Sequence, residues 1–210
     1  MSDVHEHLEH AEHVEHAAHS NKKIALVIAM LALFLAFSET LGKGAQTAAL
    51  SENIQASDLW NFFQAKTIRQ TVLRTAGETN AIGLAAIADP ATKAAMEKQI
   101  DTWKKTIDRY ETEPSTKEGR KELTKRAQEL EHRRDTNLAK YENYELASAA
   151  FQIGIVLASA SVITGLLALV YGAAGLGAIG LMFMGFGLFS PETLEHLQHM
   201  FEHAGPVAGH

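Results

Sequence analysis

The hydrophobic positions of this chain are gathered into two long uncharged blocks. The first block, "IALVIAMLALFLAF", covers residues 24–37, and the second extends over residues 146–191. Nearly all charged residues lie between these blocks or at the two ends of the chain. A membrane span needs about 20 mostly apolar residues, and charged flanks mark its two ends. The pattern therefore predicts an integral membrane protein built from helices.

The first span is expected at residues 21–41. Lys22 and Lys23 sit at its start, and Ser20 is a candidate N-cap for its helix. No small-residue cleavage site closes the segment, which favours a retained helix over a secretory signal peptide. Glu39 is the one acid in the span, and it lies close enough to the end for its side chain to reach the membrane interface. We therefore expect a structural Glu39 and not an ion path.

The second block is too long for one crossing of the bilayer. Residues 151–189 would form a helix of about 58 Å at 1.5 Å per residue, roughly twice the hydrocarbon thickness. The glycines in "YGAAG", residues 171–175, predict a tight turn there. Spans are thus expected at residues 149–170 and 174–189. The alternative is that the glycine-rich second part re-enters the membrane without crossing it.

The region between the spans, residues 42–148, is expected to be helical nearly throughout. Its first part carries apolar residues from Leu59 and Trp60 to Val72, and two prolines divide the rest. Asp89 and Pro90 read as N-cap and first position of one helix, and the S-x-x-E pattern at residues 115–118 predicts a capping box for the next. Apolar residues then recur at coiled-coil spacings of three and four, first at Met96, Ile100, Trp103, Ile107 and Tyr110 and again at Leu123, Ala127 and Leu130. Arg134 and Asn137 interrupt this seam before it continues at Tyr141 and Tyr144.

These elements predict an all-α membrane protein with three transmembrane helices. A long helical hairpin, a coiled-coil-like stalk, is expected between the first and the second span. A tail at residues 1–20 and an amphipathic C-terminal tail at residues 190–210 complete the chain. The stalk should pack its two halves together and join other copies, because each half is too narrow to hide its own apolar side.

An aromatic cluster marks the first half of the stalk, with Trp60, Phe62, Phe63, Gln64 and Lys66 close together. One interpretation is a docking or ligand patch. The other, which we favour, is an aromatic layer of the stalk core, because aromatic stripes at helical spacing are usually packing.

Two stretches of the chain resemble a known family. "ASDLWNFFQAKTIRQ" (residues 56–70) and "YELASAAFQIGIVLASASVITG" (residues 144–165), together with a His/Glu-rich N-tail, are similar to small bacterial membrane proteins catalogued only as a domain of unknown function. The resemblance covers about residues 5–189. It implies an inner-membrane helical protein and no particular activity.

Composition excludes several classes of protein and site. The chain has no cysteine, so disulfides and thiolate metal sites are absent, and a net charge of −6 gives no support to nucleic-acid binding. No nucleotide-binding loop, nucleophile elbow or H-E-x-x-H zinc motif occurs. We therefore expect no enzymatic activity and no tightly bound cofactor.

Histidine is the one residue type that points to chemistry. The N-terminal stretch "HEHLEHAEHVEHAAH" includes His7, His10, His13 and His16, and the C-terminal tail carries His196, His199 and His203. Imidazole suits zinc, nickel or copper, and helical two-histidine clamps use i, i+4 spacing, which only the pair His199 and His203 provides among these residues. Two alternatives remain: a pH-responsive tail, because imidazole titrates near pH 6.5, and a plain exposed helix in which Glu precedes His by four residues.

The sequence thus favours a structural or scaffolding membrane protein that forms homo-oligomers. A divalent-metal-binding or pH-responsive membrane protein, acting as a sensor or an accessory to transport, is the alternative. The expected partners are the lipid bilayer, further copies of the chain and an unidentified membrane protein. Lys22 and Lys23 favour a cytoplasmic N-terminus in a bacterial inner membrane. With three spans, the stalk and the C-terminus would then be extracytoplasmic.

Overall fold

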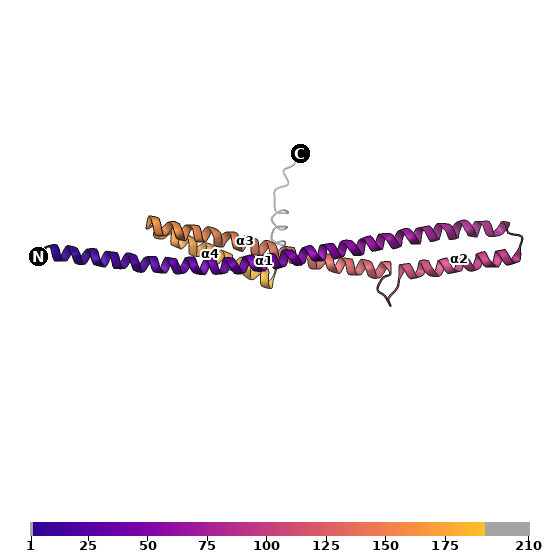
Figure 1. Cartoon of the computed structure of the whole chain (residues 1–210), viewed down its shortest axis with the longest axis horizontal. Coiled ribbons are helices and arrows are strands. Elements are labelled where there is room, and N and C mark those ends of the chain that lie inside the picture. The colour runs from indigo at the N-terminus through magenta and orange to yellow at the C-terminus, as the bar shows by residue number, and fades with distance from the viewer. Residues whose placement is uncertain (1, 192–210) are drawn as a thin grey trace, which may run out of the picture. The chain divides into compact units, whose positions relative to one another are not determined.

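The structure is a computed structural model that describes the backbone of residues 2–191 and the side chains of residues 22–191. Its elements are helix α1 (Ser2–Gly83), a short 3-10 turn η1 (Leu84–Ala86), α2 (Pro90–Glu111), α3 (Arg120–Thr164) and α4 (Leu167–Phe189) (Figure 1). Every regular element among the described residues is a helix, so the predicted all-α class is confirmed.

Three of these helices are long and apolar enough to cross a membrane. They are the stretch of α1 that follows Lys22, then α3 and α4. Their order confirms the predicted three-span architecture with a long helical region between the first and second spans. The chain divides into two compact units, residues 1–48 with 136–210 and residues 49–135, which are described separately.

The first unit contains the three apolar helical stretches. Ser38 of α1 meets Tyr144 of α3, and Leu31 meets Gly154, so these two helices run antiparallel. The helix α4 runs parallel to α1, because its Gly177 also meets Leu31 whereas its Gly187 meets Tyr144. The buried core of the unit consists of Ile24, Leu31, Ala147, Phe151, Ala158 and Ala173.

Packing in this unit places large side chains against glycine. A Cβ atom added to Gly180 would lie 2.6 Å from Cε1 of Phe151, and one added to Gly187 would lie 2.7 Å from Cε1 of Tyr144. Small residues allow membrane helices to approach closely, because lipid supplies no hydrophobic force between helices and van der Waals contact must hold them. Gly180 and Gly187 of α4 therefore leave space for the aromatic side chains of Phe151 and Tyr144 on α3.

The turn between the last two spans lies earlier than predicted. The helix α3 ends at Thr164 and α4 begins at Leu167, whereas residues 171–175 lie inside α4, so the predicted turn there is wrong. Gly165 makes the turn with φ of +70°, a left-handed conformation that glycine adopts without steric cost. Gly172 instead faces the side chain of Leu157, so it serves packing.

The second unit pairs the later part of α1 with α2 and the beginning of α3. Gln70 of α1 contacts Ile107 of α2, and Gly77 lies opposite Trp103, so α1 and α2 run antiparallel. The predicted N-cap is confirmed, because the Asp89 carboxylate accepts a hydrogen bond of 2.9 Å from the backbone N–H of Thr92. The apolar positions predicted on α2 are its less exposed ones; Ile100 is buried, and Met96, Trp103, Ile107 and Tyr110 are half-buried.

Two predicted helix starts are wrong. The helix α1 continues through Ser20, so no helix begins at this residue. The helix α3 begins at Arg120, so the pattern at residues 115–118 forms no capping box. Lys117 has φ of 57°, which breaks the helical path, and the carboxylate of Glu122 accepts the backbone N–H of Glu113 instead.

Candidate functional site

An open pocket of about 450 Å³ lies between α1 and α3 of the first unit, at the end of the apolar stretches. The pocket is lined by charged, amide, hydroxyl and small side chains: Ser38, Glu39, Gly42, Lys43, Gln46, Tyr141, Tyr144, Glu145, Ser148, Ala149 and Gln152. We call it the interfacial pocket. Tyrosine and lysine are typical of the membrane–water boundary, and the uncharged block of α3 begins at Leu146, within this region.

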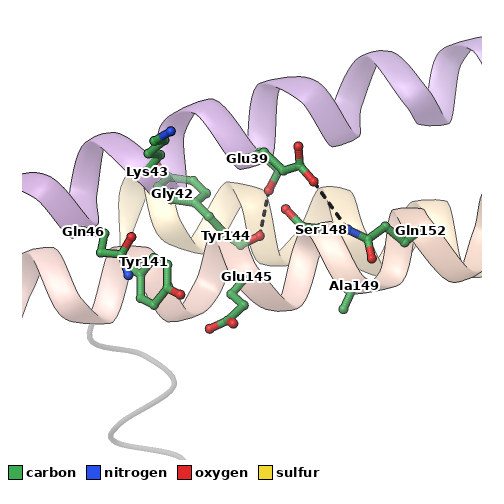
Figure 2. A pocket seen from close by; sticks show the side chains of 11 residues that line it. Glu39, Gly42, Lys43, Gln46, Tyr141, Tyr144, Glu145, Ser148, Ala149 and Gln152 are labelled. Atoms are coloured by element: carbon green, nitrogen blue, oxygen red, sulfur yellow. Dashed lines mark hydrogen bonds between the residues drawn. The ribbon is translucent and has the colours of Figure 1, made fainter.

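Two hydrogen bonds tie the walls of the interfacial pocket together (Figure 2). The buried hydroxyl of Ser38 donates to the backbone oxygen of Tyr144 at 2.8 Å. The amide of Gln152 donates to the carboxylate of Glu39 at 3.4 Å. The expected position of Glu39 near the end of the span agrees with this, because its side chain is exposed and contacts Gln152 of α3 beside the interfacial pocket.

The charged groups of the interfacial pocket are not neutralised by one another. Glu39 precedes Lys43 by four residues, the spacing that suits an ion pair on a helix. In the described part of the chain, however, no ion pair involves Glu39, Lys43 or Glu145. Figure 2 shows Glu39 directed towards Gln152 and the Lys43 ammonium turned away from it. Glu39, Lys43 and Glu145 are therefore not paired with one another, and Figure 2 shows the Glu145 carboxylate directed away from Glu39.

A second constellation, in the second unit, surrounds Lys66 of α1. Only 4% of this residue is exposed. Its ammonium donates to the backbone oxygen of Glu118, lies 3.6 Å from the carboxylate of Glu113 and stands 4.9 Å from the ring centre of Phe62. A buried ammonium needs such partners, because removing it from water is costly. Lys66 therefore fixes the loop of residues 112–119 against α1.

Arg120 extends this constellation by one helical turn. Its guanidinium donates to the side-chain oxygen of Gln70 at 2.6 Å and to Glu111 at 2.9 Å, and it lies 4.8 Å from the ring centre of Phe63. Gln70 in turn donates to the backbone oxygen of Ile107 at 3.3 Å. One residue from each of the three helical stretches of the unit is thereby joined, which is a structural arrangement and presents no reactive group.

The aromatic cluster predicted around Trp60 belongs to the same layer. The rings of Trp60 and Phe63 meet edge to face with centres 5.5 Å apart, and the indole N–H donates to Glu131 at 2.8 Å. These contacts agree with the interpretation as an aromatic layer of the stalk.

A third surface is the outward face of α1 in the second unit. Residues at spacings of three and four form a row without a single charge: Leu50, Ile54, Ser57, Asn61, Ala65, Ile68, Val72, Thr75, Thr79 and Ile82. We call this row the stalk seam. Ile68 is 65% exposed and Ile82 is 81% exposed, and the other large apolar members are exposed as well. Val72, expected to continue the apolar positions of Trp60 and Phe63, lies on this opposite face.

The resemblance to a known family extends over most of the chain. Residues 20–190 match the family described as "Domain of unknown function (DUF4337)". The chain belongs to this family. No curated protein and no solved structure matches the chain. The match covers both units of the DUF4337 chain and leaves out the histidine-rich ends.

The histidine sites predicted from the sequence fall at the margins of the structure. His196, His199 and His203 lie outside the described residues. His7, His10, His13 and His16 lie on the backbone of α1, in the part whose side chains are not described. Among the residues that are described, no three histidine or carboxylate side chains gather to hold a metal ion.

Sequence reasoning missed the interfacial pocket and the partners of Lys66. The pocket brings residues 38–46 together with residues 141–152, and no local spacing relates the two stretches. The stalk seam, by contrast, could have been found, because its three-and-four spacing and its lack of charge are visible in the sequence.

Proposed function

We propose that this DUF4337 protein is a structural membrane protein that self-associates through its stalk and its spans. The stalk seam carries the proposal. This charge-free row of ten residues spans 33 positions, from Leu50 to Ile82, and would extend about 48 Å at 1.5 Å per residue. Exposed apolar rows of this kind are typical of interaction sites.

The spacing of the stalk seam favours a second copy of the chain as its occupant. Steps of three and four residues are the pattern by which helices pack along a shared seam. Spans anchored in one membrane would present identical seams side by side and in the same direction. Asn61 is the one amide residue of the row, which also includes Ser57, Thr75 and Thr79, and an asparagine in such a seam influences the register and the number of helices.

The spans offer a second contact region. An added Cβ at Gly175 or at Gly185 of α4 would meet no described atom within 4 Å. These glycines are thus not occupied by packing within the described chain, unlike Gly180 and Gly187. Close approach of another helix is easiest at such positions.

The proposed location is a bacterial inner membrane, with the N-terminus in the cytoplasm. Lys22 and Lys23 at the start of the first span support this orientation. In the first unit α1 is parallel to α4, so residues 48 and 136 leave the bundle at the end where Phe189 lies. The stalk and the C-terminus would then share the outer side. The proposal assigns no catalytic step to the protein.

Oligomeric state tests the proposal directly. The full chain should form a discrete oligomer in mild detergent and in lipid nanodiscs, measured by analytical ultracentrifugation and native mass spectrometry. The double substitution Ile68→Glu with Val72→Glu should weaken association by at least about a hundredfold, because burying each such side chain contributes about 1.5–3 kcal/mol.

Arg69→Glu provides the matched control, because it changes the charge of the neighbouring exposed position without touching the stalk seam. This variant should associate like the wild type. A wild-type chain that is monomeric in both media would refute the proposal, and so would equal weakening by both variants.

A second candidate function is loose binding of zinc, nickel or copper by the histidine-rich ends. The i, i+4 spacing of His199 and His203 and the run of histidines in the first 19 residues support it. Calorimetry with each metal on the full chain and on a version lacking residues 1–20 tests this candidate. Absence of saturable binding to the full chain would exclude it.

A further inference from the structure

We infer that the interfacial pocket binds the headgroup of a phospholipid that carries both a primary ammonium and a phosphate, as in phosphatidylethanolamine. The pocket has the position, the charges and the shape for such a group. Each of these three features is independent of the proposed self-association, since no residue of the stalk seam lines the pocket.

The position of the interfacial pocket matches that of lipid headgroups. The uncharged first block ends shortly before Ser38, and the second block begins at Leu146, so the pocket straddles both boundaries. Tyr141 and Tyr144 line it, and tyrosine is enriched at this depth because its ring is apolar and its hydroxyl is polar. A headgroup of a lipid in the same leaflet reaches this level without leaving the membrane.

The charges of the interfacial pocket favour an ammonium. Glu39 receives one long hydrogen bond of 3.4 Å from Gln152, so its carboxylate retains capacity for a stronger donor. Glu145 lines the opposite wall, where no hydrogen bond or ion pair to another described residue involves its carboxylate. Figure 2 shows the Glu145 carboxylate directed away from Glu39. A primary ammonium has three N–H donors and can satisfy the Glu39 carboxylate, whereas a trimethylated ammonium has none.

Lys43 supplies the complementary charge. Its ammonium has no carboxylate within ion-pair distance among the described residues, although Glu39 is four residues away on the same helix. Lys43 is therefore available to a phosphate oxygen beside an ammonium held by Glu39. Lysine binds phosphate as a point charge and does not require a fixed geometry.

The shape allows the rest of the lipid to stay in the bilayer. The pocket is open, and its volume of about 450 Å³ suits a headgroup. One helical turn deeper along the same walls come Leu35 on α1 and Val156 on α3, and Val156 is exposed. Acyl chains can follow these apolar side chains.

Native mass spectrometry of the full chain in mild detergent tests the inference. The probes are phosphatidylethanolamine, phosphatidylcholine and phosphatidylglycerol with identical acyl chains. We expect phosphatidylethanolamine to bind about tenfold more tightly than the other two, because only it offers a charge-assisted hydrogen bond to Glu39 together with a phosphate. Equal binding of the three lipids would overturn the inference.

Two variants locate the site. Glu39→Gln should reduce phosphatidylethanolamine binding about tenfold, the effect of losing one charge-assisted hydrogen bond. Ala149→Trp should block binding by filling the pocket from its exposed α3 wall. The control Glu142→Gln makes the same charge change at an exposed position that does not line the pocket. Unchanged binding in both test variants, with helical content intact by circular dichroism, would refute the site.

A competition arm separates a lipid from a free soluble ligand. Millimolar O-phosphoethanolamine carries the same headgroup without acyl chains. We expect it to displace the bound lipid poorly, because the bilayer concentrates the lipid at the pocket. If O-phosphoethanolamine displaced the bound lipid as efficiently as a short-chain phosphatidylethanolamine does, the ligand would be a soluble phosphoethanolamine and not a lipid headgroup.

Discussion

The two units of this chain hold their helices together by opposite means. In the unit of the spans, Phe151 and Tyr144 insert into spaces above Gly180 and Gly187, and the core contains no charged side chain. In the unit of the stalk, a buried lysine and Arg120 join the helices through carboxylates and amides. The difference teaches that each unit is held by the kind of contact that stabilises helices in its own surroundings.

The physical reason lies in what each medium does to a contact. In lipid, apolar side chains gain nothing by leaving the solvent, so tight van der Waals packing around small residues decides stability. In water, burial of apolar surface drives association, and a buried charge is tolerated only when oppositely charged groups and hydrogen bonds compensate for its desolvation. The stalk can therefore contain Lys66, whose partners hold a loop, while the spans cannot.

The largest expected effect tests the packing of the spans. Gly180→Leu should destabilise the protein by about 3 kcal/mol, because the added side chain overlaps the ring of Phe151. The measurement is the midpoint of unfolding in mixed micelles with increasing dodecyl sulfate, followed by far-UV circular dichroism. Gly185→Leu, at a position with open space, is the control and should shift the midpoint little. Similar shifts in both would show that the glycine–aromatic contact is unimportant.

The next effect tests the buried charge of the stalk. Lys66→Ala should destabilise the second unit by about 2 kcal/mol, because Glu113 loses the buried one of its two cationic partners and the loop loses its anchor. Trp60 and Trp103 are the two tryptophans of the chain, and both lie in this unit, so tryptophan fluorescence follows its unfolding. The exposed Lys125→Ala is the control. A stalk insensitive to Lys66→Ala but sensitive to Lys125→Ala would contradict the contrast between the units.

A smaller effect concerns the buried hydrogen bond between Ser38 of α1 and Tyr144 of α3 in the first unit. Ser38→Ala should cost about 1 kcal/mol, because it removes the bond of 2.8 Å to the backbone oxygen of Tyr144. Thr40→Ala is matched to it, since Thr40 bonds only to the backbone of its own helix at Ala36. The same micelle titration compares them, and equal costs would argue that the bond between helices has no special value.

The smallest effect is a pH dependence at the tip of the stalk. The hydrogen bonds from Thr92 lower the pKa of the exposed Asp89 carboxyl below its ordinary value. A lowered folded-state pKa stabilises the fold above the ordinary pKa, and this contribution is lost as the pH falls through the folded-state pKa. Tryptophan-monitored unfolding should therefore weaken slightly more on acidification in wild type than in Asp89→Ala. An identical acid dependence of the wild type and Asp89→Ala would show that the Asp89 cap does not contribute to stability.

Predictions made from the sequence succeeded where local pattern decides structure. The three apolar stretches, the cap at Asp89 and the less exposed face of α2 follow from hydropathy, capping chemistry and helical spacing. The prediction of the turn between the last two spans failed, because contacts between neighbouring helices determine its position. Glycines at residues 172 and 175 predicted a turn, but α3 offers the side chain of Leu157 to Gly172, and Gly165 makes the turn instead.

The sequence by itself determined the helical class, the presence of three membrane-competent helices and the charge-free stalk seam, because each depends on residues close together along one helix. The tertiary structure alone decided which glycines receive an aromatic ring, which lysine is buried and which charges line the interfacial pocket. Those features join residues from about 30 to more than 110 positions apart, such as Phe151 with Gly180 and Glu39 with Gln152, and only folding brings such residues within contact distance.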